Sequence, residues 1–226
     1  MFLAMDTVFD QCSIAILDGS GKVISSQTET GKRMQTQQIL PMIDAALTKS
    51  QLSLADIQAL IFNRGPGAFS GIRINTAVVQ ALSVAHDLPC VGISSLQAIA
   101  QCAYQQYGLT EVYSALDARM QQVYFGHYQL KDAIMQPVFE DNRDTEQLLD
   151  YERQTLLHIP IVGNGAGLLN HHDEQMCHED VCPDAVVIGQ LGIAQFMALG
   201  GTDAALALPK YLRNQAWKTL KEQGKA

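Results

Sequence analysis

Residues 63–74 read NRGPGAFSGIRI and are the most informative stretch of the chain. It lies between an apolar segment, 59–63, and an Ala/Val-rich segment, 70–86, which predict a buried strand and a helix. Small residues at such a junction permit a tight turn, and exposed helix N–H groups can meet an anion. The spacing fits neither GxGxxG nor a Walker loop, because the third glycine is displaced and no Lys-Ser or Lys-Thr follows. We therefore favour a structural turn whose helix is capped by Ser70.

The residues around this junction predict an α/β lobe. Three short segments bounded by turn residues are typical of strands: 2–5, 12–17 and 22–27. Apolar residues then recur every three or four positions from 35 to 50, which predicts a helix. Pro41 within it predicts either a kink or a later start, near Leu40. A further helix is expected near 95–107.

The second half of the chain repeats this order of elements without repeating its residues. The pattern predicts strands over 112–118, 122–130, 133–140 and 159–163, and helices over 145–152 and 186–200. The sequence therefore predicts an internally duplicated α/β protein, with mixed sheets flanked by helices. We expect one lobe over 1–106 and a second over 107–226, with the last ~15 residues packing back on the first. Actin-like nucleotide-binding folds have two such lobes and a cleft between them, an analogy of fold alone.

Composition restricts the class of function. The 226 residues are 47% hydrophobic and 17% charged, which is typical of a folded globular protein and excludes a disordered chain. The net charge of -8 opposes autonomous nucleic-acid binding. Residues 209–226 are an exception, because they carry five Lys or Arg residues against one Glu. Five cysteines, an odd number, with no leader sequence or long apolar run, predict a cytoplasmic protein that crosses no membrane.

Polar residues and glycines stand where the cleft of an actin-like fold would lie. They border the first hairpin and close the corresponding strand of the second half. Their side chains either face a nucleotide or satisfy local turn amides and a local ion pair, and the sequence leaves both interpretations open. Val8, Phe9 and Asp10 replace the glycines that commonly wrap a phosphate, which weakens the first interpretation. The candidate cleft and loop residues are Asp6, Thr7, Ser13, Gly65, Gly67, Gly71, Arg73, Asp117, Arg119, Gly163 and Gly165.

A segment rich in His and Cys raises the question of zinc. Its side chains are preferred zinc ligands, but their spacing matches no common structural zinc pattern: His171, His172, Cys177, His178 and Cys182. A surface loop is the favoured interpretation. The sequence holds no HExxH pair, and no Ser/His/Asp or Cys/His set can be assigned.

Four stretches together resemble the TsaB (YeaZ) family: LAMDTVFDQCSIAI (3–16), GPGAFSGIRI (65–74), ALDARMQQVYF (115–125) and PKYLRNQAW (209–217). The resemblance extends from the first strand to the last residues. It implies an actin-like (ASKHA, RNase H-like) fold and an accessory role in threonylcarbamoyladenosine modification of tRNA, beside the catalytic paralogue TsaD and the ATPase TsaE. It also implies a homodimer when the chain is alone, tRNA contact only through the complex, no intrinsic cofactor, and ATP or ADP at the complex interface.

The resemblance further implies which residues act. Relatives of the TsaD type carry a histidine pair with metal-ligand spacing, and the aligned positions here are Ser95 and Ile99. Neither side chain replaces an imidazole as ligand of a transition metal, so we expect no metal and no catalysis by this chain. The expected dimer interface lies on the first two helices and consists of Ile39, Met42, Ile43, Ala46, Ile74, Ala77, Val78, Ala81, Leu82 and Ala85.

Two other functions compete with this one. An actin-like ATP-binding hydrolase or phosphotransferase would act on its own through the candidate cleft residues, and would bind Mg-ATP saturably. A peptidase is a weaker alternative, because no nucleophile or metal pair is recognisable.

Overall fold

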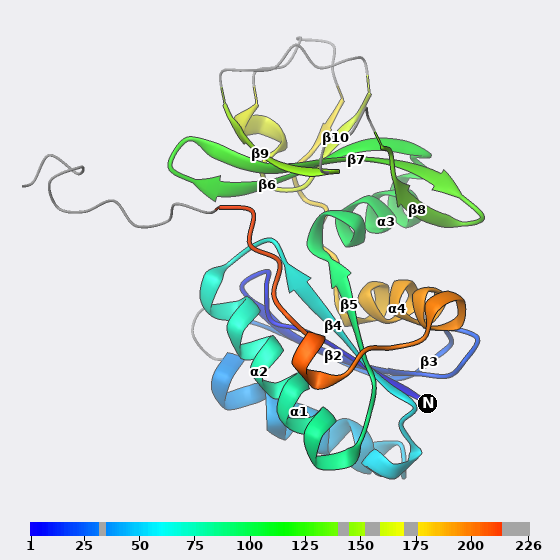
Figure 1. The fold of residues 1–226 in the computed structure, drawn as a ribbon. Coiled ribbons are helices and arrows are strands. Elements are labelled where there is room, and N and C mark those ends of the chain that lie inside the picture. The colour runs from blue at the N-terminus through cyan, green and yellow to red at the C-terminus, as the bar shows by residue number, and fades with distance from the viewer. Residues whose placement is uncertain (32–34, 140–144, 152–158, 170–175, 214–226) are drawn as a thin grey trace, which may run out of the picture.

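Each lobe of the molecule is built on one mixed β-sheet (Figure 1). The computed structural model describes residues 1–31, 35–139, 145–151, 159–169 and 176–213. The first half contains β1 (Phe2–Asp6), β2 (Gln11–Leu17), β3 (Val23–Thr30), α1 (Gln35–Lys49), η1 (Leu54–Asp56), β4 (Ala59–Gly65), α2 (Phe69–His86), β5 (Cys90–Ser94) and α3 (Ser95–Tyr107). The second half contains β6 (Glu111–Arg119), β7 (Gln122–Lys131), β8 (Ile134–Pro137), β9 (Glu146–Asp150), β10 (Ile161–Val162), η2 (Ala166–Leu168), β11 (Cys177–His178), α4 (Ala185–Leu199) and η3 (Ala204–Leu206).

The two sheets share one topology. The first has the strand order β3-β2-β1-β4-β5, and the second the order β8-β7-β6-β10-β11, with β9 beside β7. In each sheet an antiparallel meander joins parallel strands: β1 pairs with β4, and β6 pairs with β10. The duplicated sheet topology and the actin-like arrangement of two mixed sheets flanked by helices are therefore confirmed.

The helix predicted over 145–152 is wrong. The chain forms strand β9 there, which pairs antiparallel with β7 from Gly126↔Glu146 to Gln122↔Asp150. The side chain of Glu146 is 4% exposed and accepts a hydrogen bond from the hydroxyl of Tyr128 on β7. Pairing with a long neighbouring strand outweighs the local helix propensity of these residues.

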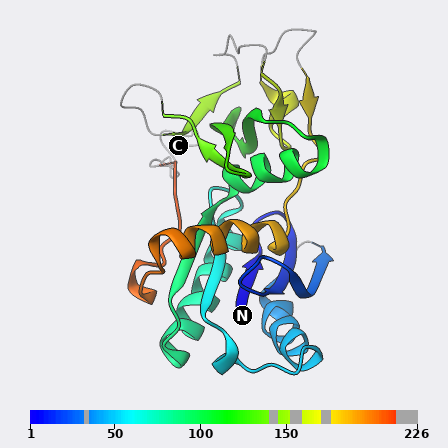
Figure 2. The same cartoon turned by 90° about the vertical axis from the view of Figure 1, so that its right-hand side faces the viewer.

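Helix α4 covers the first sheet although it follows the second lobe in sequence (Figure 2). Alternate residues of β1 point to opposite faces, one covered by α1 and α2 and the other by α4. Gly189 and Gly192 allow α4 to approach closely, because a Cβ at these positions would overlap Leu17 and Ile61 respectively. The expected second lobe, 107–226, is therefore corrected, because α4 returns to the first lobe.

The chain after α4 also lies along the first lobe. Thr202 forms a β-bridge with Cys90, and the backbone N–H of Lys210 donates to the carbonyl of Arg64 at 2.8 Å. Of the last ~15 residues, which were expected to pack on the first lobe, all but 212 and 213 lie outside the described residues. Arg213 binds the β6–β7 turn of the second lobe instead.

The cap predicted for α2 is wrong, whereas α1 starts at the predicted residue and not at the later alternative near Leu40. The N-cap of α2 is Ala68, which makes no side-chain cap, and Ser70 is exposed within the first turn. Helix α1 runs from Gln35 and includes Pro41, which lies on its exposed side. Within the described ranges, none of the helices is long and apolar enough to cross a membrane.

Candidate functional site: an exposed helix face and an interlobe cleft

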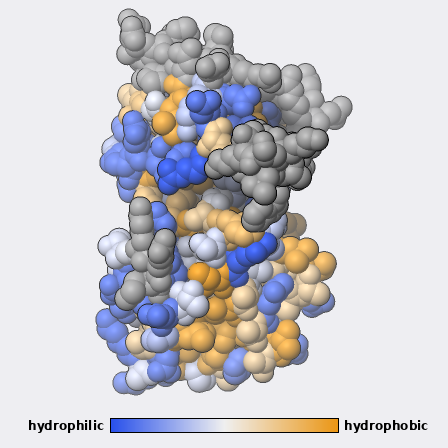
Figure 3. Space-filling model, turned by 90° about the vertical axis from the view of Figure 1, so that its left-hand side faces the viewer, coloured by the Kyte–Doolittle hydropathy of each residue, from blue (hydrophilic) through white to orange (hydrophobic). Residues whose placement is uncertain are grey.

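The outer side of α2 is apolar and open to solvent, and orange surface gathers on the lobe that carries it (Figure 3). Six residues predicted for an interface are half-buried or exposed there: Ile74, Ala77, Val78, Ala81, Leu82 and Ala85. Val84, which is 77% exposed, extends this surface. We call these seven residues the α2 face.

The inner side of α2 holds the helix to the sheet through polar groups. The side-chain amide of Asn75 is fully buried and donates to the carbonyls of Met5 at 3.2 Å and Asn63 at 2.9 Å. Ser83 Oγ donates to the carbonyl of Leu88 at 2.6 Å. Because polar residues occupy much of the buried side, much of the apolar surface of this helix is left on the outside.

The residues predicted on the first helix are not available to a partner. Ile39, Met42, Ile43 and Ala46 are at most 5% exposed and pack into the core of the first lobe. Their helical spacing marks the side of α1 that faces its own sheet, so this part of the predicted interface is corrected. The side that α1 presents to solvent includes Leu40, Pro41, Asp44 and Ala45.

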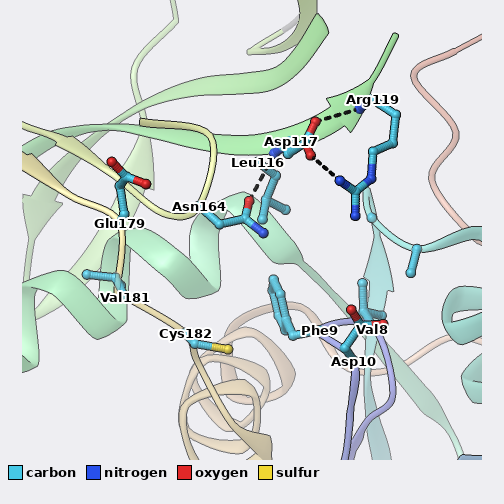
Figure 4. A pocket seen from close by; sticks show the side chains of 12 residues that line it. Val8, Phe9, Asp10, Leu116, Asp117, Arg119, Asn164, Glu179, Val181 and Cys182 are labelled. Carbon is cyan, nitrogen blue, oxygen red and sulfur yellow. Dashed lines mark hydrogen bonds and ion pairs between the residues drawn. The ribbon is translucent and has the colours of Figure 1, made fainter. Parts of the chain in front are cut away.

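A cleft of about 230 Å³ lies between the two lobes (Figure 4). The first lobe lines it with the β1–β2 loop and the β4–α2 loop, and the second with the end of β6 and the loops near β10 and β11. Its residues are Val8, Phe9, Asp10, Gly67, Ala68, Leu116, Asp117, Arg119, Asn164, Glu179, Val181 and Cys182. Among the predicted cleft residues, only Gly67, Asp117 and Arg119 line it. The sequence did not predict Asn164 and Glu179 as cleft residues, although Asn164 lies between Gly163 and Gly165, which were predicted.

The charges of this cleft oppose phosphate. Asp10, Asp117 and Glu179 bring three carboxylates, against one guanidinium from Arg119. That guanidinium is already paired with Asp117, at 2.7 Å from Nη1 to Oδ2, and Asp117 also accepts the backbone N–H of Arg119. The local ion pair anticipated from the sequence is therefore present. An anion entering here would meet excess negative charge at close range.

Asp6 is a structural residue beneath the cleft. It is fully buried, and its carboxylate accepts from the N–H of Val8 at 2.8 Å, from Asn63 Nδ2 at 3.1 Å and from Gln11 Nε2 at 3.4 Å. Burial raises the pKa of Asp6 to about 7, and the nearby Asp184 acts in the same direction. The bond to Val8 is the turn-amide interaction that the sequence left open for Asp6.

The hydroxyls of the first hairpin are also occupied. Thr7 Oγ1 donates to the carbonyl of Gly71 at 2.7 Å, and a Cβ on Gly71 would overlap the carbonyl oxygen of Thr7. Ser13 Oγ lies 2.7 Å from Thr28 Oγ1 and accepts the N–H of Ala185, the first residue of α4, at 3.0 Å. These groups join the β1–β2 hairpin to α2 and α4, so none of them is left facing a ligand.

The remaining predicted loop residues serve close backbone packing. Gly65 and Gly163 have φ of 94° and 98°, which favours glycine. A Cβ on Gly163 or Gly165 would crowd the backbone of β6, so the approach to another backbone anticipated for this loop is present. Arg73 lies outside this cleft, at a second hollow between the lobes.

The two positions aligned with the TsaD-type histidine pair, Ser95 and Ile99, carry side chains that pack within the fold. Ser95 Oγ donates to Asn63 Oδ1 at 2.7 Å, and Ile99 is fully buried in the core. Among the residues that the structure describes, no group of three or more His, Cys, Asp and Glu side chains could hold a metal ion. In the His/Cys-rich segment, Cys177–His178 form β11 and Cys182 lines the cleft, while residues 171 and 172 lie outside the described ranges.

A buried polar cluster joins the two lobes beside the cleft. The carboxylate of Glu146, on β9, accepts hydrogen bonds from Tyr128 Oη at 2.6 Å and from Ser94 Oγ. Lys210, on the segment after α4, places Nζ 3.0 Å from Glu146 Oε2. Because Ser94 and Lys210 lie with the first lobe and Glu146 with the second, this cluster fixes the lobes relative to each other. We call it the interlobe clamp.

Comparison with known proteins identifies the family. The sequence model of the family described as TsaD, tRNA N6-adenosine threonylcarbamoyltransferase, matches residues 21–216. The protein named tRNA threonylcarbamoyladenosine biosynthesis protein TsaB from Escherichia coli is 37% identical, over 96% of this chain and 97% of its own. The protein of the same name from Haemophilus influenzae is 32% identical, over 96% of both chains.

Solved structures agree with these relatives. A structure described as YeaZ from Pseudomonas aeruginosa matches 93% of this chain and 99% of its own, with a TM-score of 0.83 and 33% identity. Another from the same organism, described as an uncharacterized protein with similarity to peptidase YEAZ, matches with a TM-score of 0.85 and 33% identity over 94% of this chain and 99% of its own. Sequence and fold thus agree over nearly the whole length, and the chain belongs to the TsaB (YeaZ) family of tRNA threonylcarbamoyladenosine biosynthesis proteins.

Proposed function

We propose that this chain is a non-catalytic accessory subunit for the transfer of threonylcarbamoyl to adenosine in tRNA. It binds a TsaD-like catalytic paralogue through the α2 face and activates it together with a TsaE-like ATPase. ATP or ADP sits at the interface of that complex, and tRNA is reached only through it. The single observation that carries this proposal is the exposed apolar side of α2.

The size of the α2 face suits an exchangeable interface. Eighteen residues of helix extend about 27 Å. Ala77, Ala81 and Ala85 lie along it at every fourth position and allow close approach of a partner helix. With the exposed side of α1 beside it, the surface can approach the roughly 800 Å² per partner that a stable interface buries. The same face then serves two copies of this chain and, in exchange, one copy with the paralogue.

The interlobe cleft argues against the alternative of an independent ATP-binding hydrolase or phosphotransferase. Phe9 occupies the position of a phosphate-wrapping loop, three carboxylates line the walls, and the lone arginine is already paired. Asp6, Thr7 and Ser13 are committed to hydrogen bonds within the fold. We infer that the isolated chain gives no saturable Mg-ATP binding at millimolar nucleotide in calorimetry. Saturable binding at that concentration would favour the alternative.

Light scattering tests the proposal directly. The wild-type chain should form a one-to-one complex with its cognate TsaD-like protein, and the double variant Ala77→Glu, Ala81→Glu should not, because two carboxylates would be desolvated in an apolar contact. Ala198→Glu provides a matched control, since it places the same charge on an exposed alanine of α4. A complex that survives the double variant, or that never forms in the wild type, would contradict the proposal.

A further inference from the structure

A second and larger hollow lies between the lobes beside the N-terminal end of α2. Its volume is about 620 Å³, against about 230 Å³ for the cleft. Aromatic and cationic side chains dominate its walls: Phe69, Arg73, Tyr124, Lys210, Tyr211 and Arg213. We call it the basic groove. The basic groove is a separate feature from the set of candidate cleft residues and from the α2 face.

The positive charges of the basic groove are only partly neutralised. Lys210 is paired with Glu146 in the interlobe clamp. Arg73 and Arg213 have no carboxylate partner among the described residues, in a chain whose net charge is -8. Arg213 Nη2 donates to the carbonyls of Ala118 and Arg119 and to Gln122 Oε1, which holds the guanidinium in place without cancelling its charge. Its Nε is buried and has no hydrogen-bond partner within the described part of the chain.

Aromatic rings stand beside these guanidinium groups. Arg73 Cζ lies 3.7 Å from the centroid of the Phe69 ring, and Arg73 Nε donates to Tyr211 Oη at 3.3 Å. The Phe69 and Tyr211 rings are 5.9 Å apart between centroids, and the two residues remain 50% and 43% exposed. The groove therefore offers a held guanidinium for a phosphate next to an open aromatic surface for a flat ring. This combination is how proteins bind unpaired nucleotides of RNA.

We propose that the basic groove binds unpaired nucleotides of the tRNA substrate, with a base stacked on Tyr211 and a phosphate at Arg73. The inference rests on the proposed function, since it assumes that the chain acts on tRNA within a complex. A strand of RNA fits better than a free mononucleotide because the groove holds two guanidinium groups, of Arg73 and Arg213, that can meet successive phosphates. Elsewhere the acidic surface repels RNA, so the groove contributes to binding only when a partner supplies further contacts.

The test measures binding of a fluorescein-labelled, unmodified tRNA transcript to the complex of this chain with its TsaD-like partner, by anisotropy at several salt concentrations. Arg73→Gln should weaken binding about tenfold and lower the magnitude of the salt slope by about 0.7, the value for one phosphate contact on a single strand. Tyr211→Leu should also weaken binding about tenfold, the effect of losing one stacked base. Tyr211→Phe keeps the ring and should bind like the wild type. Lys22→Gln, which removes an exposed charge from the β2–β3 turn, is the matched control.

Other outcomes would overturn the inference in distinguishable ways. Groove variants that bind tRNA like the wild type exclude an RNA contact, and a Tyr211→Phe variant as weak as Tyr211→Leu assigns the effect to the hydroxyl bond with Arg73. If the groove variants lose ADP binding in calorimetry but keep tRNA binding, the groove is a mononucleotide site. Light scattering of each variant with the partner separates this inference from the proposed function. Loss of the complex in Arg73→Gln makes the groove a protein contact. The proposed function fails instead if the wild type forms no complex or if the Ala77→Glu, Ala81→Glu variant still forms one.

Discussion

Replacing Lys210 by Met would test the interlobe clamp. The variant keeps the length and the apolar stem of the side chain but leaves the carboxylate of Glu146, which is 4% exposed, without its cation. At the observed separation of 3.0 Å and an effective dielectric constant of roughly 20, the Coulomb attraction is about 5 kcal/mol before the cost of desolvation. Removing one partner of a buried pair costs about 3–5 kcal/mol.

Two features of the clamp place the expected loss at the low end of that range. The side chain of Lys210 is 23% exposed, so water screens part of the attraction. Glu146 also keeps its hydrogen bonds from Tyr128 and Ser94. We therefore expect Lys210→Met to lower the free energy of unfolding by about 3 kcal/mol, which for a chain of this length lowers the Tm by about 6–12 °C.

Urea and thermal unfolding, followed by circular dichroism, would measure both quantities. The double variant Lys210→Met, Glu146→Gln removes the buried charge together with its partner and should recover all but about 1 kcal/mol. Lys22→Met, an exposed control, should stay within about 0.5 kcal/mol of the wild type. The reasoning would be refuted if the single and double variants were equally destabilised, or if the single variant lost less than about 1 kcal/mol.

Three further predictions concern the hairpin beneath the cleft. Because burial raises the pKa of Asp6 from 3.8 in the unfolded chain to about 7, the folded state holds an extra proton between these values, so its stability should fall as pH rises from 4 to 7. Asp6→Asn should flatten that part of the profile in urea titrations at successive pH values, and an unchanged slope would assign it to another group. Gly71→Ala should cost about 1–3 kcal/mol in urea unfolding because the added Cβ overlaps the Thr7 carbonyl, whereas Gly19→Ala, which meets no atom closer than 3.8 Å, should be nearly neutral; equal losses would contradict this packing. Ser13→Ala should cost about 1–2 kcal/mol in chemical denaturation, since the N–H of Ala185 would lose its acceptor; a neutral result would mean that another group accepts this bond.

The α2 face illustrates what helical spacing reveals and what it leaves undecided. Six residues recur at helical spacing on the outer side of α2: the alanines Ala77, Ala81 and Ala85 are exposed, and Ile74, Val78 and Leu82 are half-buried against the core. The same reasoning applied to Ile39, Met42, Ile43 and Ala46 identified a side of α1 that is buried in its own lobe. Apolar periodicity predicts that a surface will be covered, but it does not say whether the cover is the same chain or another.

The cleft shows a similar division. Gly67, Asp117 and Arg119 line it because they lie at or just beyond the ends of β4 and β6, strands that the duplicated topology places on either side of the cleft. Asn164 and Glu179 were not, because each reaches the cleft through a loop whose course depends on the packing of β10 and β11. Asp6 had the expected position at a strand end, but its three hydrogen-bond donors decided that it serves the turn.

Local spacing and short motifs were enough to predict the strands and helices of the first half, the glycine junction between β4 and α2, and the family. The tertiary structure alone decided that 145–152 would not form a helix, that α4 would return to the first sheet, and that Glu146 and Lys210 would meet between the lobes. The physical reason is that these features depend on contacts between residues far apart in the chain. Strand pairing, the fit of Gly189 and Gly192 against the sheet, and the need to neutralise a buried carboxylate outweigh the preferences of any single segment.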